Sequence, residues 1–236
     1  MKLGLFSDPH YCKSDNIGLG RRPCLSYGKI KDAMDAFEKE NIDVCFCLGD
    51  LTDHVEGDTK EDAKDNLHKV MELINSYNIP FYLVPGNHDY LMLDATDLKS
   101  ENIHTPPYKI ELREHNFIVL DGNYRSNGER FDTAGVVWDD SNLPDFELDF
   151  LRKELESSKK PCVVLIHENL DPTVQEQHIV KNAHVVRQII KESGKVKLVI
   201  QGHFHEGSER IIDNIRYLTL KGMCQGNDNP YIILDI

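Results

Sequence analysis

Five short apolar runs, each stopped abruptly by Asp, His or Asn, constrain the fold of this chain more than any other feature. The clearest lies in the stretch 43–53, where an apolar run ends at Gly49 and two carboxylates, Asp50 and Asp53, follow. A short apolar run bounded by glycine and polar residues is typical of a buried strand. We therefore expect Asp50 at the carboxyl end of a strand, where open α/β sheets hold ligands because several loops meet there.

The other four runs also end in residues that can bind a polar ligand or a metal ion. They cover residues 2–7, 81–84, 162–166 and 196–200, and the polar residues that follow them are Asp8, His10, Asn87, His88, His167, His203 and His205. One histidine after a strand would mean little, but five such endings in one chain are hard to assign to chance. The sequence therefore predicts that these side chains converge on Asp50.

Helical patterns separate the early runs. Apolar spacing predicts a helix over residues 28–41, and a second helix follows that Asp58 or Thr59 caps, with Glu61 placed for a capping box on Asp58. Strand, helix and strand in succession imply parallel strands joined by a right-handed crossover.

The later part of the chain contains more strands. The pattern predicts a hairpin of 108–112 with 117–121, a long polar loop over 122–140, helices from Pro144 and over 175–192, and strands at 210–212, 215–220 and 231–235. No linker and no break in composition divides the chain, so we expect one domain over residues 1–236. The predicted fold class is α/β, with two packed mixed sheets and helices outside.

The chain is acidic, with a formal net charge of −13. This charge disfavours nonspecific binding to nucleic acid or to an anionic membrane, which needs a basic surface. It is compatible with a phosphorylated substrate, because bound divalent ions can invert the local field. We find neither a signal-like segment nor a run that could span a bilayer, so we expect a cytoplasmic protein with reduced cysteines. The sequence leaves the oligomeric state open.

The converging side chains are oxygen and nitrogen donors. Carboxylate and imidazole ligands without a thiolate suit Mn, Fe, Zn or Co better than a structural zinc site. The candidate ligands are seven: Asp8, His10, Asp50, Asn87, His167, His203 and His205. Seven are too many for one tetrahedral ion and fit two ions, divalent or of mixed valence, that share Asp50. Two ions about 3.5–4 Å apart suit displacement at phosphorus, because they lower the pKa of a bridging water into the hydroxide range and neutralise phosphoryl oxygens.

His88 follows the candidate ligand Asn87 and is not itself counted as a ligand. Imidazole has an unperturbed pKa of about 6.5, which suits the transfer of a proton to the leaving oxygen. Asp53 or Asp89 could hold the tautomer of this ring. The expected reaction is hydrolysis of a phosphoester in which a hydroxide between the metals attacks phosphorus and His88 assists the leaving group.

In their order along the chain, these motifs resemble the five-block signature of the calcineurin-like metallophosphoesterases. The blocks are residues 8–10, 49–53 and 86–89, His167, and residues 202–205. The resemblance implies a four-layer α-β-β-α sandwich with a dinuclear centre. It implies that one metal takes Asp8, His10, Asp50 and His205, and the other Asp50, Asn87, His167 and His203. It also implies that His88 is the proton donor or phosphate contact and that Asp53 orients it.

Substrate contacts are harder to find in the sequence. Arg21 and Arg22 are candidates for phosphate binding, and solvated surface charges are the alternative. The pair is similar to an arginine-rich segment of Mn-dependent ADP-ribose/CDP-alcohol diphosphatases, which favours a small soluble phosphodiester or nucleotide diphosphate derivative as the substrate. Trp138 could stack on a base, although packing of its loop is the preferred interpretation. Glu168 stands near a position where many relatives have a small residue or proline, so we expect it to alter the groove wall.

Two alternatives stay open. The first is a phosphomonoesterase, including a phosphoprotein phosphatase, but protein phosphatases of this family have Arg and Glu where this chain has His54 and Asp89. The second is a non-catalytic scaffold with the same fold, like the retromer subunit, whose metal site is impaired. The intact ligand positions and His88 argue against a scaffold.

Overall fold

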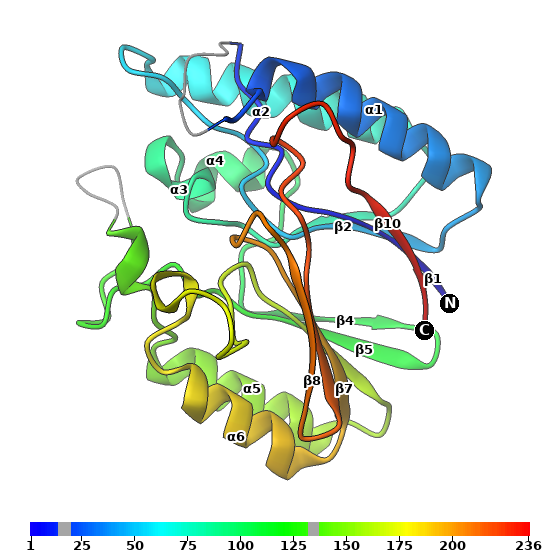
Figure 1. Cartoon of the computed structure of the whole chain (residues 1–236), viewed down its shortest axis with the longest axis vertical. Coiled ribbons are helices and arrows are strands. Elements are labelled where there is room, and N and C mark those ends of the chain that lie inside the picture. The colour runs from blue at the N-terminus through cyan, green and yellow to red at the C-terminus, as the bar shows by residue number, and fades with distance from the viewer. Residues whose placement is uncertain (14–19, 132–136) are drawn as a thin grey trace.

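The strands form two sheets that face each other, with helices over both outer faces (Figure 1). The structure is a computed structural model that describes residues 1–13, 20–131 and 137–236. The strand order is β10-β1-β2-β3 in the first sheet and β4-β5-β6-β7-β9-β8 in the second. The predicted four-layer sandwich of two mixed sheets is therefore confirmed.

Parallel strands form the centre of both sheets. The first sheet consists of β1 (Lys2–Phe6), β2 (Val44–Cys47), β3 (Phe81–Leu83) and β10 (Ile232–Asp235). The second consists of β4 (Tyr108–Leu112), β5 (His115–Val119), β6 (Cys162–Leu165), β7 (Val196–Gln201), β8 (Ser208–Ile212) and β9 (Ile215–Thr219). β10 pairs antiparallel to β1, and β4 and β8 pair antiparallel to β5 and β9.

Two long helices cover each sheet. α1 (Pro23–Lys39) and α2 (Lys60–Asn75) lie on the first sheet, and α5 (Asp145–Ser157) and α6 (Ala183–Ser193) lie on the second (Figure 1). The connections contain the short helices α3 (Asp89–Met92) and α4 (Ala95–Ser100) and the 3₁₀ turns η1 (Trp138–Asp140) and η2 (Glu176–His178). Among the described residues, no helix is both long and apolar enough to cross a membrane.

The core has three parts because the strands are buried on both faces. Leu3, Leu5 and Phe46 pack between the two sheets, whereas Cys45 and Cys47 pack on the outer face beneath α1 and α2. Burial on both faces explains why the run that forms β2 is apolar without interruption. Cys45 and Cys47 are buried free cysteines, in keeping with the reduced cysteines expected from the sequence.

The starts of α1 and α2 differ from the sequence prediction. α1 begins at Pro23, well before residue 28, because proline is favoured in the first turn of a helix. Thr59 caps α2, and Asp62 rather than Glu61 closes the capping box. The capping box predicted on Asp58 is therefore wrong.

The start of α6 was also predicted too early. The segment near residue 175 forms η2, and Ile179 then makes a β-bridge with Asn169. The backbone N–H of Val180 donates to the carbonyl of Asn169 at 3.0 Å, so the chain is paired there, and a turn over residues 181–182 then leads into α6 at Ala183. Tertiary pairing overrides the helical periodicity of this stretch. The predicted end of this helix near residue 192 is confirmed, since α6 ends at Ser193 and Gly194 follows with a left-handed φ of +64°.

Two glycines near α1 provide a matched test of the packing. A Cβ on Gly4 in β1 would collide with Phe37 and Ile42, whereas a Cβ on the exposed Gly28 in α1 would meet nothing within 4 Å. We predict that Gly4→Ala lowers the free energy of unfolding by about 1–3 kcal/mol. Gly28→Ala should raise it by about 0.4–1 kcal/mol. Urea unfolding followed by circular dichroism measures both changes, and effects of the same sign would contradict this packing.

Candidate metal centre

Loops from both sheets meet at one edge of the sandwich and bring the predicted strand-end residues together. Asp8 and His10 follow β1, Asp50 and Asp53 follow β2, Asn87 and His88 follow β3, His167 follows β6, and His203 and His205 follow β7. Backbone N–H groups of one loop donate to carboxylates of another across this edge. The N–H of His203 donates to the Asp8 carboxylate at 3.2 Å, and the N–H of His88 donates to Asp50 Oδ1 at 2.8 Å.

The backbone at this edge is strained. Asp8, His10, Asp50 and His203 have positive φ values of 52°, 49°, 51° and 65°. Non-glycine residues adopt this region at an energetic cost, and such residues cluster at functional sites. Gly49 has a φ of +105°, and a Cβ there would overlap the imidazole of His167. Glycine at this position therefore allows His167 from the second sheet to approach the loop that carries Asp50.

A first group of donors surrounds Asp8. The Nε2 atoms of His10 and His205 lie 3.1 Å apart, and His205 Nε2 lies 3.2 Å from Asp8 Oδ1. His10 Nε2 also lies 3.4 Å from Asp50 Oδ2. Spacings of this size are expected for donors that share one ion with bond lengths of about 2.0–2.2 Å.

A second group surrounds His167 and uses the same carboxylate. His167 Nε2 lies 3.4 Å from Asp50 Oδ2, and donor atoms of Asp50, His167 and His203 all lie within 4.8 Å of one another. Within the described chain, three buried atoms of this group have no hydrogen-bond partner: Asn87 Oδ1, His167 Nε2 and His203 Nε2. Unpaired buried polar atoms are costly, and a metal ion would satisfy all three. The residues therefore fit a pair of ions that share Asp50.

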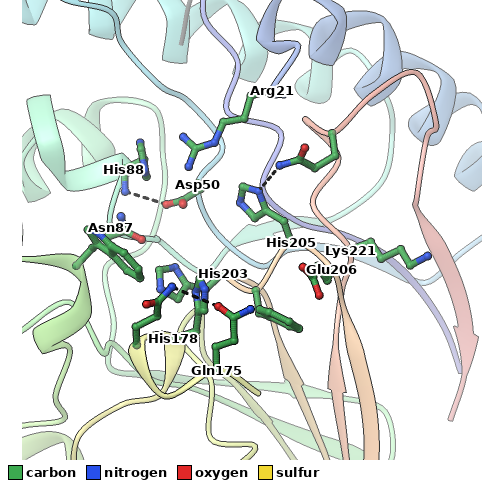
Figure 2. A pocket seen from close by; sticks show the side chains of 14 residues that line it. Arg21, Asp50, Asn87, His88, Gln175, His178, His203, His205, Glu206 and Lys221 are labelled. Carbon is green, nitrogen blue, oxygen red and sulfur yellow. Dashed lines mark hydrogen bonds between the residues drawn. The ribbon is translucent and has the colours of Figure 1, made fainter. Parts of the chain in front are cut away.

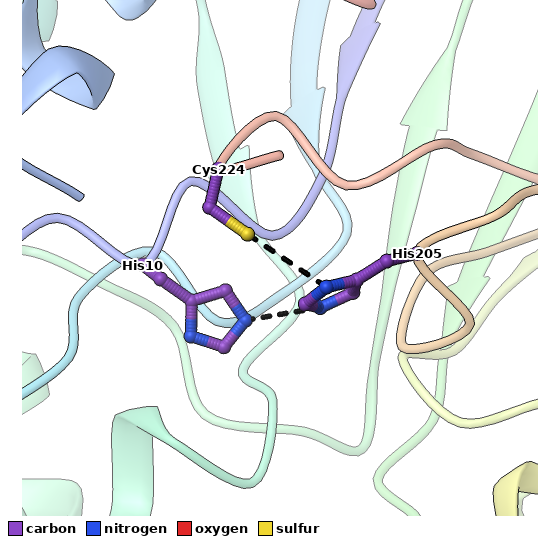
Figure 3. Close-up of side chains that lie close together, drawn as sticks. All are labelled: His10, His205 and Cys224. Atoms are coloured by element: carbon purple, nitrogen blue, oxygen red, sulfur yellow. Dashed lines mark hydrogen bonds between the residues drawn. The ribbon is translucent and has the colours of Figure 1, made fainter. Parts of the chain in front are cut away.

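The outward nitrogens of three histidines are held by other groups. Nδ1 of His10 donates to Asp53 Oδ2 at 3.0 Å, and Nδ1 of His167 donates to the Leu48 carbonyl at 2.5 Å. Nδ1 of His205 faces the Gln225 amide at 2.9 Å. It also lies 3.7 Å from the Cys224 thiol (Figure 3). These contacts leave each Nε2 for the centre, because outer contacts of this kind fix the orientation of a ligating imidazole.

Burial and neighbouring charge set the protonation of these groups. Burial, together with the positive charge of His88, lowers the pKa of His10 to about 4, and burial also lowers the pKa of His203. Burial would raise the pKa of Asp50, but the surrounding histidines outweigh it and hold that pKa well below its usual value. His167 differs: burial lowers its pKa, but the charge of Asp50 outweighs burial and raises it. Carboxylates and neutral imidazoles are the forms that bind metals.

Asp53 connects three side chains of the site. Its Oδ1 accepts from His88 Nδ1 at 2.9 Å, while its Oδ2 accepts from His10 Nδ1 at 3.0 Å and from Arg21 at 3.2 Å. Asp89 instead accepts from the backbone N–H groups of Leu51, Thr52 and Gly86. Of the two carboxylates considered for orienting His88, Asp53 is the one in contact with it.

A pocket of about 820 Å³ opens above the two donor groups (Figure 2). Asp50, Asn87, His88, His203 and His205 line its floor, and Figure 2 shows Arg21 and His88 on the same side of the donors. A volume of this size accommodates a small organic phosphate.

Several residues of the pocket were not predicted from the sequence. His178 carries no signal of a site role in the sequence, yet its ring centroid lies 5.0 Å from that of His203. Trp138, which the sequence offered as a possible base-stacking residue with loop packing preferred, lies beside it at 5.3 Å and lines the pocket. Gln175 and Lys221 line the same pocket. No strand end marks these residues, because they reach the site through loops whose positions depend on tertiary packing.

Two expectations about single residues need correction. Glu168 is 1% exposed, packs against Gly122 and is absent from the described pocket lining, so it does not form the groove wall. Burial raises its pKa to about 7. Arg21 lines the pocket, but Arg22 lies at the exposed start of α1 and is not among the described lining residues. Of the two arginines, Arg21 is the one among the described lining residues of this pocket.

The fold and the two donor groups agree with a family match. A family model for calcineurin-like phosphoesterases matches residues 1–207. This chain therefore belongs to the calcineurin-like phosphoesterases, and it is a metal-dependent phosphoric ester hydrolase.

Individual relatives support the same assignment. The chain is 24% identical over 212 residues to a 3',5'-cyclic adenosine monophosphate phosphodiesterase, CpdA, from Haemophilus influenzae, a match that covers 87% of this chain and 70% of that one. It is 27% identical over 229 residues to the CpdA of Vibrio vulnificus, with 95% and 77% covered. A dimetal phosphatase from Danio rerio has a similar fold, with a TM-score of 0.80 at 15% identity, and 99% of this chain and 91% of that chain are covered.

Metal content tests the two donor groups. We predict that the protein, purified without chelator, binds about two divalent ions per chain and that His203→Ala reduces this to about one. His68→Ala is the matched control, because His68 is exposed and pairs with Glu101 far from these groups, and it should keep the full content. Inductively coupled plasma mass spectrometry measures the ratio. An unchanged metal content in His203→Ala would contradict the role of this histidine.

Proposed function

We propose that this phosphoesterase hydrolyses a small soluble phosphodiester at a dinuclear metal centre. Asp8, His10, Asp50 and His205 would hold one ion, and Asp50, Asn87, His167 and His203 would hold the other. The observation that carries this proposal is the shared carboxylate of Asp50, whose Oδ2 lies 3.4 Å from Nε2 of both His10 and His167. Mn, Fe and Zn are the candidate metals, because mixed carboxylate and imidazole ligands suit all three.

In the proposed reaction, the metal ions activate water and His88 protonates the leaving group. Bound divalent ions would lower the pKa of a coordinated water and offset the charge on the phosphoryl oxygens. His88 lines the pocket beside them, and its Nδ1 is held by Asp53, which leaves Nε2 to face the substrate. Burial lowers the pKa of His88, but the charges of Asp50 and Asp53 outweigh it and raise the pKa above its usual value. A protonated His88 can then donate to the leaving oxygen.

Arg21 supports an anionic substrate on the same side of the pocket. Its side chain is 15% exposed, and its guanidinium is held by Asp53 at 3.2 Å. A guanidinium fixed in this way keeps further N–H groups for a phosphate oxygen. We therefore propose Arg21 as a contact to the substrate phosphate, and Arg22 has no part in this contact.

The substrate class follows from the relatives. The two sequence relatives reported above are named 3',5'-cyclic adenosine monophosphate phosphodiesterases. Their names support our proposal that this chain also acts on cyclic nucleotides or on nucleotide diphosphate derivatives. We further propose that one domain carries the activity and that the protein acts in the cytoplasm, where small phosphorylated substrates are its partners. Nucleic acid and membranes are not proposed as partners, because the net charge of −13 disfavours both.

Replacement of His88 separates an enzyme from a scaffold. We predict Mn(II)-dependent hydrolysis of bis-p-nitrophenyl phosphate and of a cyclic nucleotide, with p-nitrophenyl phosphate as the monoester comparison. His88→Ala should lower kcat for the cyclic nucleotide by roughly 2–3 orders of magnitude, because its alkoxide leaving group needs a proton and proton donation contributes about that much. It should lower kcat for bis-p-nitrophenyl phosphate far less, because nitrophenolate leaves without a proton, while His68→Ala keeps the wild-type rate on both. A chain without metal-dependent turnover of any phosphodiester would contradict the proposal.

Asp53 should influence both the metals and the acid. We predict that Asp53→Asn lowers kcat by roughly 10- to 100-fold and also weakens metal binding, because His10 and His88 both lose a charged hydrogen-bond acceptor. His88→Ala should lower the rate alone. Parallel measurements of kcat and of the metal dissociation constants compare the two variants. If Asp53→Asn slows turnover but leaves the metal affinity unchanged, the hydrogen bond from His10 to Asp53 does not contribute to metal binding.

A further inference from the structure

One side of the pocket is aromatic. Trp138 from η1, His178 from η2 and Phe204 from the loop after β7 form a row of rings, which we call the aromatic wall. The centroids of Trp138 and His178 lie 5.3 Å apart, and those of His178 and Phe204 also lie 5.3 Å apart. The rings therefore contact one another in sequence and present one surface.

The aromatic wall is partly exposed, through Trp138, and lies next to a proposed metal ligand. Trp138 is 38% exposed, and among the exposed large hydrophobic residues of the described chain it is the one that lines this pocket. The rings of Trp138 and His178 lie 5.8 Å and 5.0 Å from that of His203. A tryptophan ring that is partly open to water contributes less to the stability of the fold than a buried ring would. It is well suited to contact a ligand.

Amide groups border the aromatic wall. Gln175 and Gln177, from the chain at η2, line the same pocket and are exposed. Each side chain offers a carbonyl acceptor and two N–H donors. An aromatic surface with such groups at its edge matches a planar heterocycle, which needs stacking on its face and hydrogen bonds at its rim.

We propose that the aromatic wall binds the nucleobase of a nucleotide substrate while the phosphodiester group lies at the metal centre. This inference rests on the proposed function and deepens it, because it names the part of the substrate that the protein recognises. Stacking on aromatic side chains tolerates different bases, since each base has a π face. The pocket of about 820 Å³ is large enough to hold a nucleotide.

The sequence provides a direct probe, because Trp138 is the single tryptophan of the chain. Its fluorescence, excited at a wavelength where adenine does not absorb, is followed while the metal-loaded protein is titrated with AMP or with ribose 5-phosphate. The two ligands share a phosphate and a ribose and differ in the base. We predict saturable quenching by AMP and none by ribose 5-phosphate. AMP should also inhibit hydrolysis of bis-p-nitrophenyl phosphate more strongly, by roughly 5- to 150-fold.

Three variants separate stacking from general damage. Trp138→Ala should weaken inhibition by AMP until it equals that by ribose 5-phosphate, and Trp138→Phe should retain most of the difference. Phe146→Ala is the matched control, because Phe146 is 49% exposed on α5 and lies outside the pocket lining. It should change neither inhibition constant.

The outcomes distinguish this inference from the proposed function. If the enzyme hydrolyses phosphodiesters but AMP and ribose 5-phosphate inhibit equally and Trp138→Ala has no effect, the aromatic wall does not bind the base. If no phosphodiester is hydrolysed, the proposed function fails, and the fluorescence titration still decides the base site. Absence of quenching by AMP, with Trp138 emission intact, overturns the inference in either case.

Discussion

The rest of the site depends on the contacts that the carboxylate of Asp50 makes with histidines from both sheets. Its Oδ2 lies 3.4 Å from His10, which follows a strand of the first sheet, and 3.4 Å from His167, which follows a strand of the second. One buried charge therefore joins both sheets at their shared edge. A carboxylate buried without positive partners costs several kcal/mol. The surrounding histidines offset part of that cost, and the two cations that we propose offset the rest.

The backbone has to adopt costly conformations to build this arrangement. Asp8, His10, Asp50 and His203 have positive φ values, and Gly49 makes room for His167. The buried cores on both sides of each sheet supply the stability that holds these turns in place. Asp53 extends the same network, because it contacts both a proposed metal ligand and the proposed acid. The metal pair and the proton donor are thus parts of one hydrogen-bonded structure.

The sequence predicted the strand-end residues because the signal is local. An apolar run that stops at Asp, His or Asn marks both a strand and its carboxyl end, so the order of residues along the chain is enough to predict the convergence on Asp50. The start of α6 and the positions of Trp138 and His178 could not be predicted in this way. They depend on pairing with Asn169 and on how two loops dock beside His203, which no periodicity in the chain encodes.

In this account, paired cations bind the phosphate and the aromatic wall binds the base. Catalysis requires the carboxylate of Asp50, because both cations share it. Anomalous diffraction from crystals soaked with Mn²⁺ tests this most directly. We predict two peaks about 3.5–4 Å apart, on either side of the Asp50 carboxylate. A single peak, or two peaks of which only one contacts Asp50, would contradict the account.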